Sequence, residues 1–229
     1  LITLGASLIA GSSGDVVLEL VDGNLTLDHA VATTGGSGNV RLDVSGDLYV
    51  NHSLSTSSGN VSAFATGLIT MTGSASEVLT DGVNASLELQ ALGGAVTSTR
   101  LQSNEGNIRV EALRDIVQQG IIDARSESDR GAGSRAGQVQ WGQVSLAAQG
   151  GSIIDQSAAT SPAIFASELS LYASEDIGVS DAAIGIESAT LSALTDTGGI
   201  FIDEMSDLTV GEIADITVNR VQTDGSTET

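Results

Sequence analysis

The stretch Gly38-Asn39-Val40-Arg41-Leu42-Asp43-Val44 carries the pattern that decides the fold. A polar residue follows a glycine, and apolar side chains then occupy every second position. Because successive side chains of a strand point to opposite faces, the two valines and the leucine share one side, while Arg41 and Asp43 share the other. The stretch therefore predicts a strand with one face in an apolar interior and the other in water.

The same pattern recurs along the chain at intervals that average about 23 residues, a period typical of solenoids. Each copy is followed by a second strand signal, such as Gly46-Asp47-Leu48-Tyr49-Val50, and by a short third signal, such as Leu54. We expect an all-β parallel β-helix with three short strands per coil and about nine coils. The copies begin at residues 15, 39, 60, 84, 107, 143, 168, 188 and 215.

The composition fits this architecture and excludes several classes of protein. Aromatic residues make up 3% of the chain, as expected for a narrow interior of stacked aliphatic side chains, and there is no cysteine. The net charge of −21 argues against binding to nucleic acid or anionic membranes, which need clustered basic residues. No apolar run approaches the roughly 20 residues that a membrane-spanning helix requires.

The polar residue at the start of each copy has a structural interpretation. Asparagine side chains stacked on successive coils can hydrogen-bond to one another as an amide ladder. We expect glycines before them to adopt left-handed backbone, while the alternative is that asparagine merely suits a turn. The candidate ladder consists of Asn39, Asn60, Asn84 and Asn107.

These repeats resemble the filamentous-haemagglutinin-type repeats of large bacterial secreted adhesins. The resemblance rests on the G-N-V-x-L-x-V start, the following G-D-L-x-V and the short final apolar pair, and it covers roughly residues 1–222. It implies a right-handed parallel β-helix that serves as an extracellular stalk or fibre on a bacterial cell surface. It also implies flanking repeats of the same chain, or end-to-end self-association, as partners at the exposed coil edges.

The interval of 36 residues between the copies at 107 and 143 contains a Gly/Ser/Arg-rich insertion, residues 124–137. Insertions in solenoids form surface loops and are frequent binding sites, so this loop is a candidate site for a host glycan or protein. A tolerated surface loop is the alternative. We take 1–222 as the repeat domain and 223–229 as a tail or linker. The candidate binding residues are Arg125, Arg130, Arg135 and Trp141.

Metal binding is a weaker expectation. His29 and His52 occupy equivalent positions in neighbouring coils and could share a metal with Asp28 and Asn51, although a repeated polar turn residue is the explanation we favour. Asp155 and Asp203 end glycine-rich stretches that only loosely resemble calcium repeats. We expect no dedicated cofactor, and at most weak Ca²⁺ binding to the acidic surface.

Catalysis is the main alternative function. A carbohydrate-active β-helix enzyme, either a polysaccharide lyase or a hydrolase, would need a poised basic residue or paired carboxylates facing a groove. Lysine is absent from the chain, and Asp203-Glu204 is one of only two pairs of adjacent acids, the other being Glu175-Asp176. We therefore expect a structural stalk or fibre segment that presents binding elements away from the cell, and not an enzyme.

Overall fold

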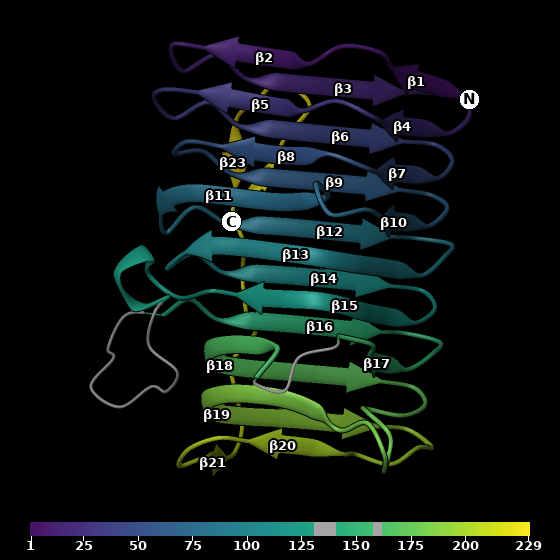
Figure 1. Cartoon of the computed structure of the whole chain (residues 1–229), viewed down its shortest axis with the longest axis vertical. Coiled ribbons are helices and arrows are strands. Elements are labelled where there is room, and N and C mark those ends of the chain that lie inside the picture. The colour runs from purple at the N-terminus through teal and green to yellow at the C-terminus, as the bar shows by residue number, and fades with distance from the viewer. Residues whose placement is uncertain (131–140, 158–161) are drawn as a thin grey trace.

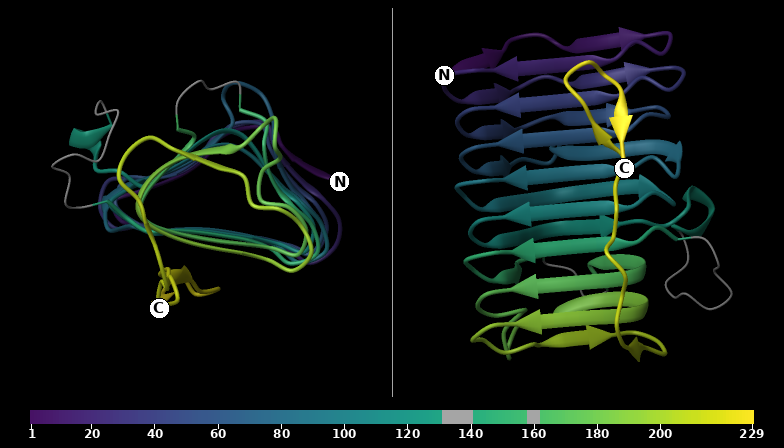
Figure 2. Two further views of the ribbon diagram at one scale, coloured as in Figure 1. Left: turned by 90° about the horizontal axis from the view of Figure 1, so that it is seen from below. Right: turned by 180° about the vertical axis from the view of Figure 1, so that it is seen from behind.

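The computed structural model confirms an all-β solenoid of parallel strands with about eight turns (Figure 1). It describes residues 1–130, 141–157 and 162–229. Most turns contribute one strand to each of three parallel sheets, and in the last two turns isolated bridges at Ile177 and Ile200 take the place of a strand in sheet 2. Viewed along its axis, the chain traces nearly the same outline in every turn (Figure 2). A single 3₁₀ turn, η1 (Glu127–Asp129), is the only helical element of the described residues.

Sheet 1 contains the strands that begin with the polar residue of the repeat. Its members pair in parallel, one coil to the next. In order along the rod they are β3 (Val16–Leu20), β6 (Val40–Val44), β9 (Val61–Ala65), β12 (Leu87–Ala91), β14 (Ile108–Ala112), β16 (Val144–Ala148), the second halves of β18 (Ile164–Ala173) and β19 (Ile184–Thr195), and β21 (Thr209–Val210).

Sheets 2 and 3 complete each turn. Sheet 2 contains β1 (Ile2–Leu4), β4 (Leu25–Leu27), β7 (Leu48–Val50), β10 (Ile69–Met71), the first parts of β13 (Val96–Asn104) and β15 (Ile116–Asp123), and β17 (Ile153–Asp155). Sheet 3 contains β2 (Leu8–Gly11), β5 (Val31–Thr34), β8 (Ser53–Thr56), β11 (Glu77–Val83), the ends of β13 and β15, the first halves of β18 and β19, and β20 (Ile202–Glu204).

The interior is one continuous column of aliphatic side chains, because the register between coils preserves the alternation of every strand. Each fully buried leucine or valine contributes about 1.5–3 kcal/mol relative to exposure. One column of sheet 1 consists of Leu18, Leu42, Ala63, Leu89, Val110, Leu146, Leu171 and Ala193.

The register corrects the sequence alignment of the copy at residue 84. Leu87 pairs with Val61, so Leu89, and not Leu87, lies over Ala63. The shift of two residues arises because β11 continues to Val83 and the chain then turns through Asn84, whose φ is 62°. Local alternation does not reveal a two-residue extension, because it leaves every side chain on the same face.

The glycine before the polar residue allows neighbouring coils to approach closely, and it does not adopt a left-handed backbone conformation. A Cβ on Gly59 would lie 2.1 Å from the carbonyl oxygen of Gly38 in the coil before it. Positive φ occurs at other glycines, such as Gly23 and Gly225. The expectation of left-handed backbone before the ladder was therefore wrong.

The chain does not remain in the solenoid to residue 222. The last strand of sheet 1 ends at Val210, and residues 211–229, which we call the strap, run back along the outside of sheet 1 towards the first coils (Figure 2). The strap ends in an antiparallel hairpin formed by β22 (Arg220–Val221) and β23 (Thr227–Glu228). The ninth sequence repeat, Asp215-Ile216-Thr217-Val218, lies in the strap, and residues 223–229 belong to this hairpin.

Candidate functional site

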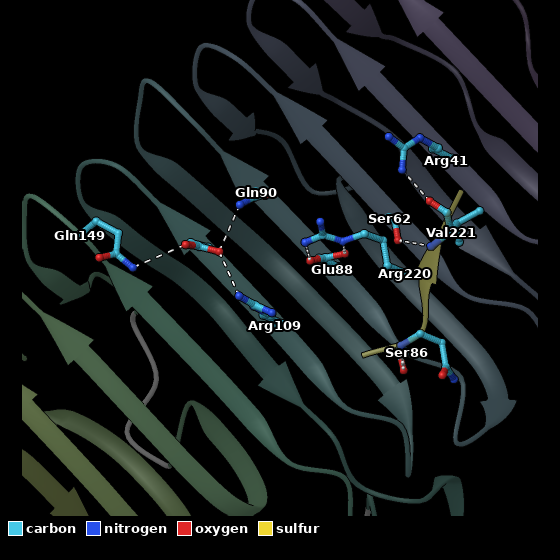
Figure 3. A network of polar contacts seen from close by, with 11 residues as sticks. Arg41, Ser62, Ser86, Glu88, Gln90, Arg109, Gln149, Arg220 and Val221 are labelled. Atoms are coloured by element: carbon cyan, nitrogen blue, oxygen red, sulfur yellow. Dashed lines mark hydrogen bonds and ion pairs between the residues drawn. The ribbon is translucent and has the colours of Figure 1, made fainter. Parts of the chain in front are cut away.

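The strap crosses the strands of sheet 1, so it cannot pair with them through backbone ladders. Side chains from successive coils bind its backbone instead (Figure 3). Arg41 donates from Nη1 to the carbonyl of Val221 at 2.5 Å, and the amide of Val221 donates to Oγ of Ser62 at 2.9 Å. One coil further along, the amide of Asn219 donates to Oγ of Ser86 at 3.1 Å. The outer surface of sheet 1 thus holds an extended segment chiefly through its backbone.

One ion pair anchors the strap to the middle of the rod. The guanidinium of Arg220 donates from Nε and Nη2 to the two carboxylate oxygens of Glu88, at 3.0 and 2.5 Å. The Glu88 side chain is only 2% exposed, and this pairing raises the pKa of Arg220 above its usual value. Phe64 lies beneath both Arg220 and Arg41, at 5.1 and 4.5 Å from ring centroid to Cζ.

Apolar side chains complete the contact. Ile216, Val218 and Val221 of the strap are buried, and Val221 is fully covered. At the hairpin turn the carbonyl of Gly225 accepts a hydrogen bond from Nδ2 of Asn39 at 3.0 Å. The strap therefore spans from the last coil to the second coil of the rod.

The polar column at the start of sheet 1 contains side-chain hydrogen bonds between coils. Oδ1 of Asn39 accepts from the amide and from Nδ2 of Asn60, at 2.8 and 3.1 Å. Oδ1 of Asn60 then accepts from the amide of Ser86 at 2.8 Å. Further along, Oδ1 of Asn107 accepts from the amide of Gln143 at 2.9 Å.

Asn84 does not belong to this column. Ser86 occupies the ladder position of that coil, two residues later, and Asn84 lies in the turn before it. Serine is too short to continue an amide ladder, and its hydroxyl accepts from the strap at this gap. Sequence reasoning therefore missed the strap contact at the same position where it misplaced the ladder.

The two described arginines of the insertion, Arg125 and Arg130, contact other parts of the protein. Arg125 is 5% exposed, forms a bidentate ion pair with Asp123 at 2.7 and 2.8 Å, and stacks on Phe165 at 3.5 Å. Arg130 donates to the carbonyl of Ser103 at 3.0 Å. Arg135 lies outside the described residues.

Trp141, where the insertion returns to the rod, is largely buried. Its Nε1 donates to Asp129 at 2.9 Å, and its ring contacts the edge of Phe165 at a centroid distance of 6.2 Å. Arg125, Arg130 and Trp141 thus fix the base of the insertion rather than project a binding surface.

The residues considered for metal binding are engaged in other contacts or exposed. Nδ2 of Asn51 donates to Asp28 at 2.8 Å, and Nδ1 of His52 accepts from the amide of Ser53 at 2.8 Å. His29 has no resolved pairing with them. Asp155 accepts from the amide of Ser157 at 2.7 Å, and Asp203 is exposed.

No group of three or more His, Cys, Asp or Glu in the described ranges could hold a metal ion. No family model, curated protein or solved structure matches this chain. Across the residues placed by the structure, no helix has the length and apolarity to cross a membrane.

Several hollows border the strap where it lies on sheet 1, and one of about 150 Å³ lies beside Asn84, Ser86 and Asn107. Of the two that contact Arg109, the smaller, about 300 Å³, is lined by Glu88, Arg109 and Arg220 together with strap residues up to Thr229. The larger, about 400 Å³, lies further towards the last coils. Its walls are Arg109, Glu111, Ser145, Ala147, Gln149 and Ser170 from the solenoid and Ile213, Ala214, Asp215, Ile216 and Thr217 from the strap.

Proposed function

We propose that this chain is a rigid structural segment, a stalk or fibre, of a secreted or cell-surface adhesin or extracellular matrix protein. The observation that supports the proposal best is the unbroken aliphatic interior, which stacks from the first coils to β19 without a gap. A solenoid whose coils contact only their neighbours extends in one dimension, which suits a spacer. The likeness of its repeats to filamentous-haemagglutinin-type stalks supports the same role. As a spacer of this kind, the rod would present binding elements away from the cell.

Partners of the rod follow from its open edges. The first and last coils leave strand edges without a neighbouring coil, and apolar side chains such as Ile9 and Val210 are exposed there. Flanking repeats, or a second rod joined end to end, would cover these edges. A stalk needs neither a catalytic site nor a dedicated cofactor, and Ca²⁺ would bind only weakly to the acidic surface.

Localisation tests this proposal directly. An antibody raised against the purified chain should label intact cells of the source organism, and immunogold particles should lie at a distance from the membrane. Labelling only after permeabilisation would contradict an extracellular stalk.

A panel of acidic and neutral polysaccharides, assayed for new reducing or unsaturated ends, distinguishes the stalk from a carbohydrate-active enzyme. We expect no release of such ends. Release of either kind of end would reject the structural role.

A further inference from the structure

The hollows of about 300 and 400 Å³ beside the strap together form what we call the trough, which runs along the rod. They share Arg109 and Thr217, and together they extend from the coil of β12 to the coil of β18. Three coil spacings of about 4.8 Å give the trough a length of roughly 14 Å. It is lined by outward side chains of sheet 1 and by residues of the strap.

The lining from sheet 1 repeats with the coils. Arg109 pairs in register with Ser145, and Ser145 with Ser170, so one outward side chain from each coil faces the trough. Neither serine hydroxyl has a hydrogen-bond partner among the residues the structure describes, although most polar groups of this face do. Both hydroxyls are therefore available to a ligand as donors and acceptors.

A network beside this row adds further polar groups. Oε2 of Glu111 accepts from Arg109 at 3.2 Å and from Gln90 at 3.1 Å, while Gln149 reaches Oε1 only at 3.5 Å (Figure 3). The Gln149 side chain is exposed, and this long contact is its one hydrogen bond to the residues that the structure describes. The trough thus offers a carboxylate, a guanidinium, an amide and two hydroxyls within three coils.

The charges of the trough narrow the class of ligand. Four carboxylates, those of Glu88, Glu111, Asp215 and Glu228, line it against the two guanidinium groups of Arg109 and Arg220. This excess of negative charge, on a chain of net charge −21, disfavours phosphates and acidic polymers. The polar lining disfavours a purely apolar ligand.

We propose that the trough binds a neutral, β-linked oligosaccharide that lies along the rod axis. Sugar hydroxyls donate and accept hydrogen bonds, so they can satisfy carboxylate, guanidinium, amide and serine groups together. The coil spacing of about 4.8 Å is comparable to the length that one sugar unit adds to an extended β-linked glycan, so successive units lie over equivalent strand positions of successive coils. No aromatic side chain lines the trough, so affinity comes from hydrogen bonds and rises with chain length.

Titration of the isotope-labelled full chain by NMR tests this proposal. Cellotetraose is the probe, cellobiose the short control, and maltotetraose the control whose α-linkages do not extend in the same way. We expect saturable shifts at the side-chain amide of Gln149 and the backbone amides of Ser145 and Ser170, with at least tenfold weaker binding of cellobiose and maltotetraose. Absence of saturable shifts with cellotetraose at 20 mM, or equal affinity for all three sugars, would overturn the proposal.

Substitutions locate the site. Ser145→Val and Ser170→Val remove a hydroxyl while retaining a residue that suits an outward strand position, and each should weaken cellotetraose binding at least tenfold. Ser192→Val is the matched control, because Ser192 pairs with Ser170 one coil further on but does not line the trough. Unchanged affinity in both trough variants, with circular dichroism confirming the fold, would refute the site. Saturable binding of a short oligoarginine peptide, without binding of any of the sugars, would also refute the site.

Discussion

Arg220 and Glu88 are 132 residues apart in the sequence, and their side chains form a two-point ion pair that fastens the strap to the centre of the rod. Glu88 faces outward from β12, yet it is buried because the strap covers it. Arg220 therefore both shields this carboxylate from water and compensates its charge.

Replacement of Arg220 by methionine should destabilise the protein, because it leaves a buried carboxylate without a cation. We expect a loss of about 2–3 kcal/mol in the free energy of unfolding, below the ~3–5 kcal/mol of fully buried pairs because the Arg220 side chain is 40% exposed. Urea unfolding measures the loss. Arg114→Met is the control and should change stability by less than about 1 kcal/mol, because Arg114 is exposed and forms no ion pair with the described residues.

The ladder predicts that substitutions of Asn60 and Asn84 have different effects on the free energy of unfolding. Asn60→Ala should cost about 1–3 kcal/mol in thermal or chemical unfolding, because it leaves the amide of Ser86 without its acceptor and removes a donor to Asn39. Asn84→Gly should be neutral or stabilising, since glycine adopts the φ of 62° at that turn without strain. Equal losses at the two positions would show that both asparagines belong to the ladder.

Close packing between coils predicts a difference between two glycines. Gly59→Ala should cost about 1–3 kcal/mol or more in unfolding free energy, because its Cβ would overlap the Gly38 carbonyl oxygen at 2.1 Å. Gly5→Ala meets no atom within 4 Å and should change stability little. If Gly59→Ala were tolerated as well as Gly5→Ala, the coils would be further apart than described.

The last coils predict a pH dependence. Burial, and then the nearby charge of Glu187, raise the pKa of Glu204 above its ordinary value of 4.5. The folded state therefore binds this proton more tightly than the unfolded state, so the free energy of unfolding falls as pH rises through the interval just above 4.5. Glu204→Gln should flatten that slope in unfolding measured from pH 4 to 7. An unchanged slope would mean that Glu204 does not contribute.

Much of the fold could be predicted because the interior positions are local in sequence. The alternation around Leu42 or Val110 identifies the side chains that face the interior without any knowledge of the neighbouring coil. The sequence repeat then identifies that neighbouring coil. Insertions that keep the alternation, such as the two residues before Ser86, remain invisible to this logic.

The strap could not be predicted in this way. Ile216 and Val218 alternate like a coil strand, but they pack on the outside of sheet 1 against residues more than a hundred positions earlier. Arg125 shows the same limit, because an arginine in a Gly/Ser-rich segment suggests exposure until Asp123 and Phe165 are seen beside it. Burial of charged groups depends on partners that local sequence does not specify.

The central claim is that one rigid rod carries its own C-terminal segment along its side. Pulsed electron paramagnetic resonance between spin labels at Ser37→Cys and Asp224→Cys tests this claim most directly, and the chain has no native cysteine to interfere. Because Asn39 bonds to Gly225, the account predicts a narrow distance distribution below about 20 Å for this pair. Labels at Asp207→Cys and Asp224→Cys should lie roughly 34 Å apart, about seven coil spacings. A broad or long distribution for the first pair would contradict the account.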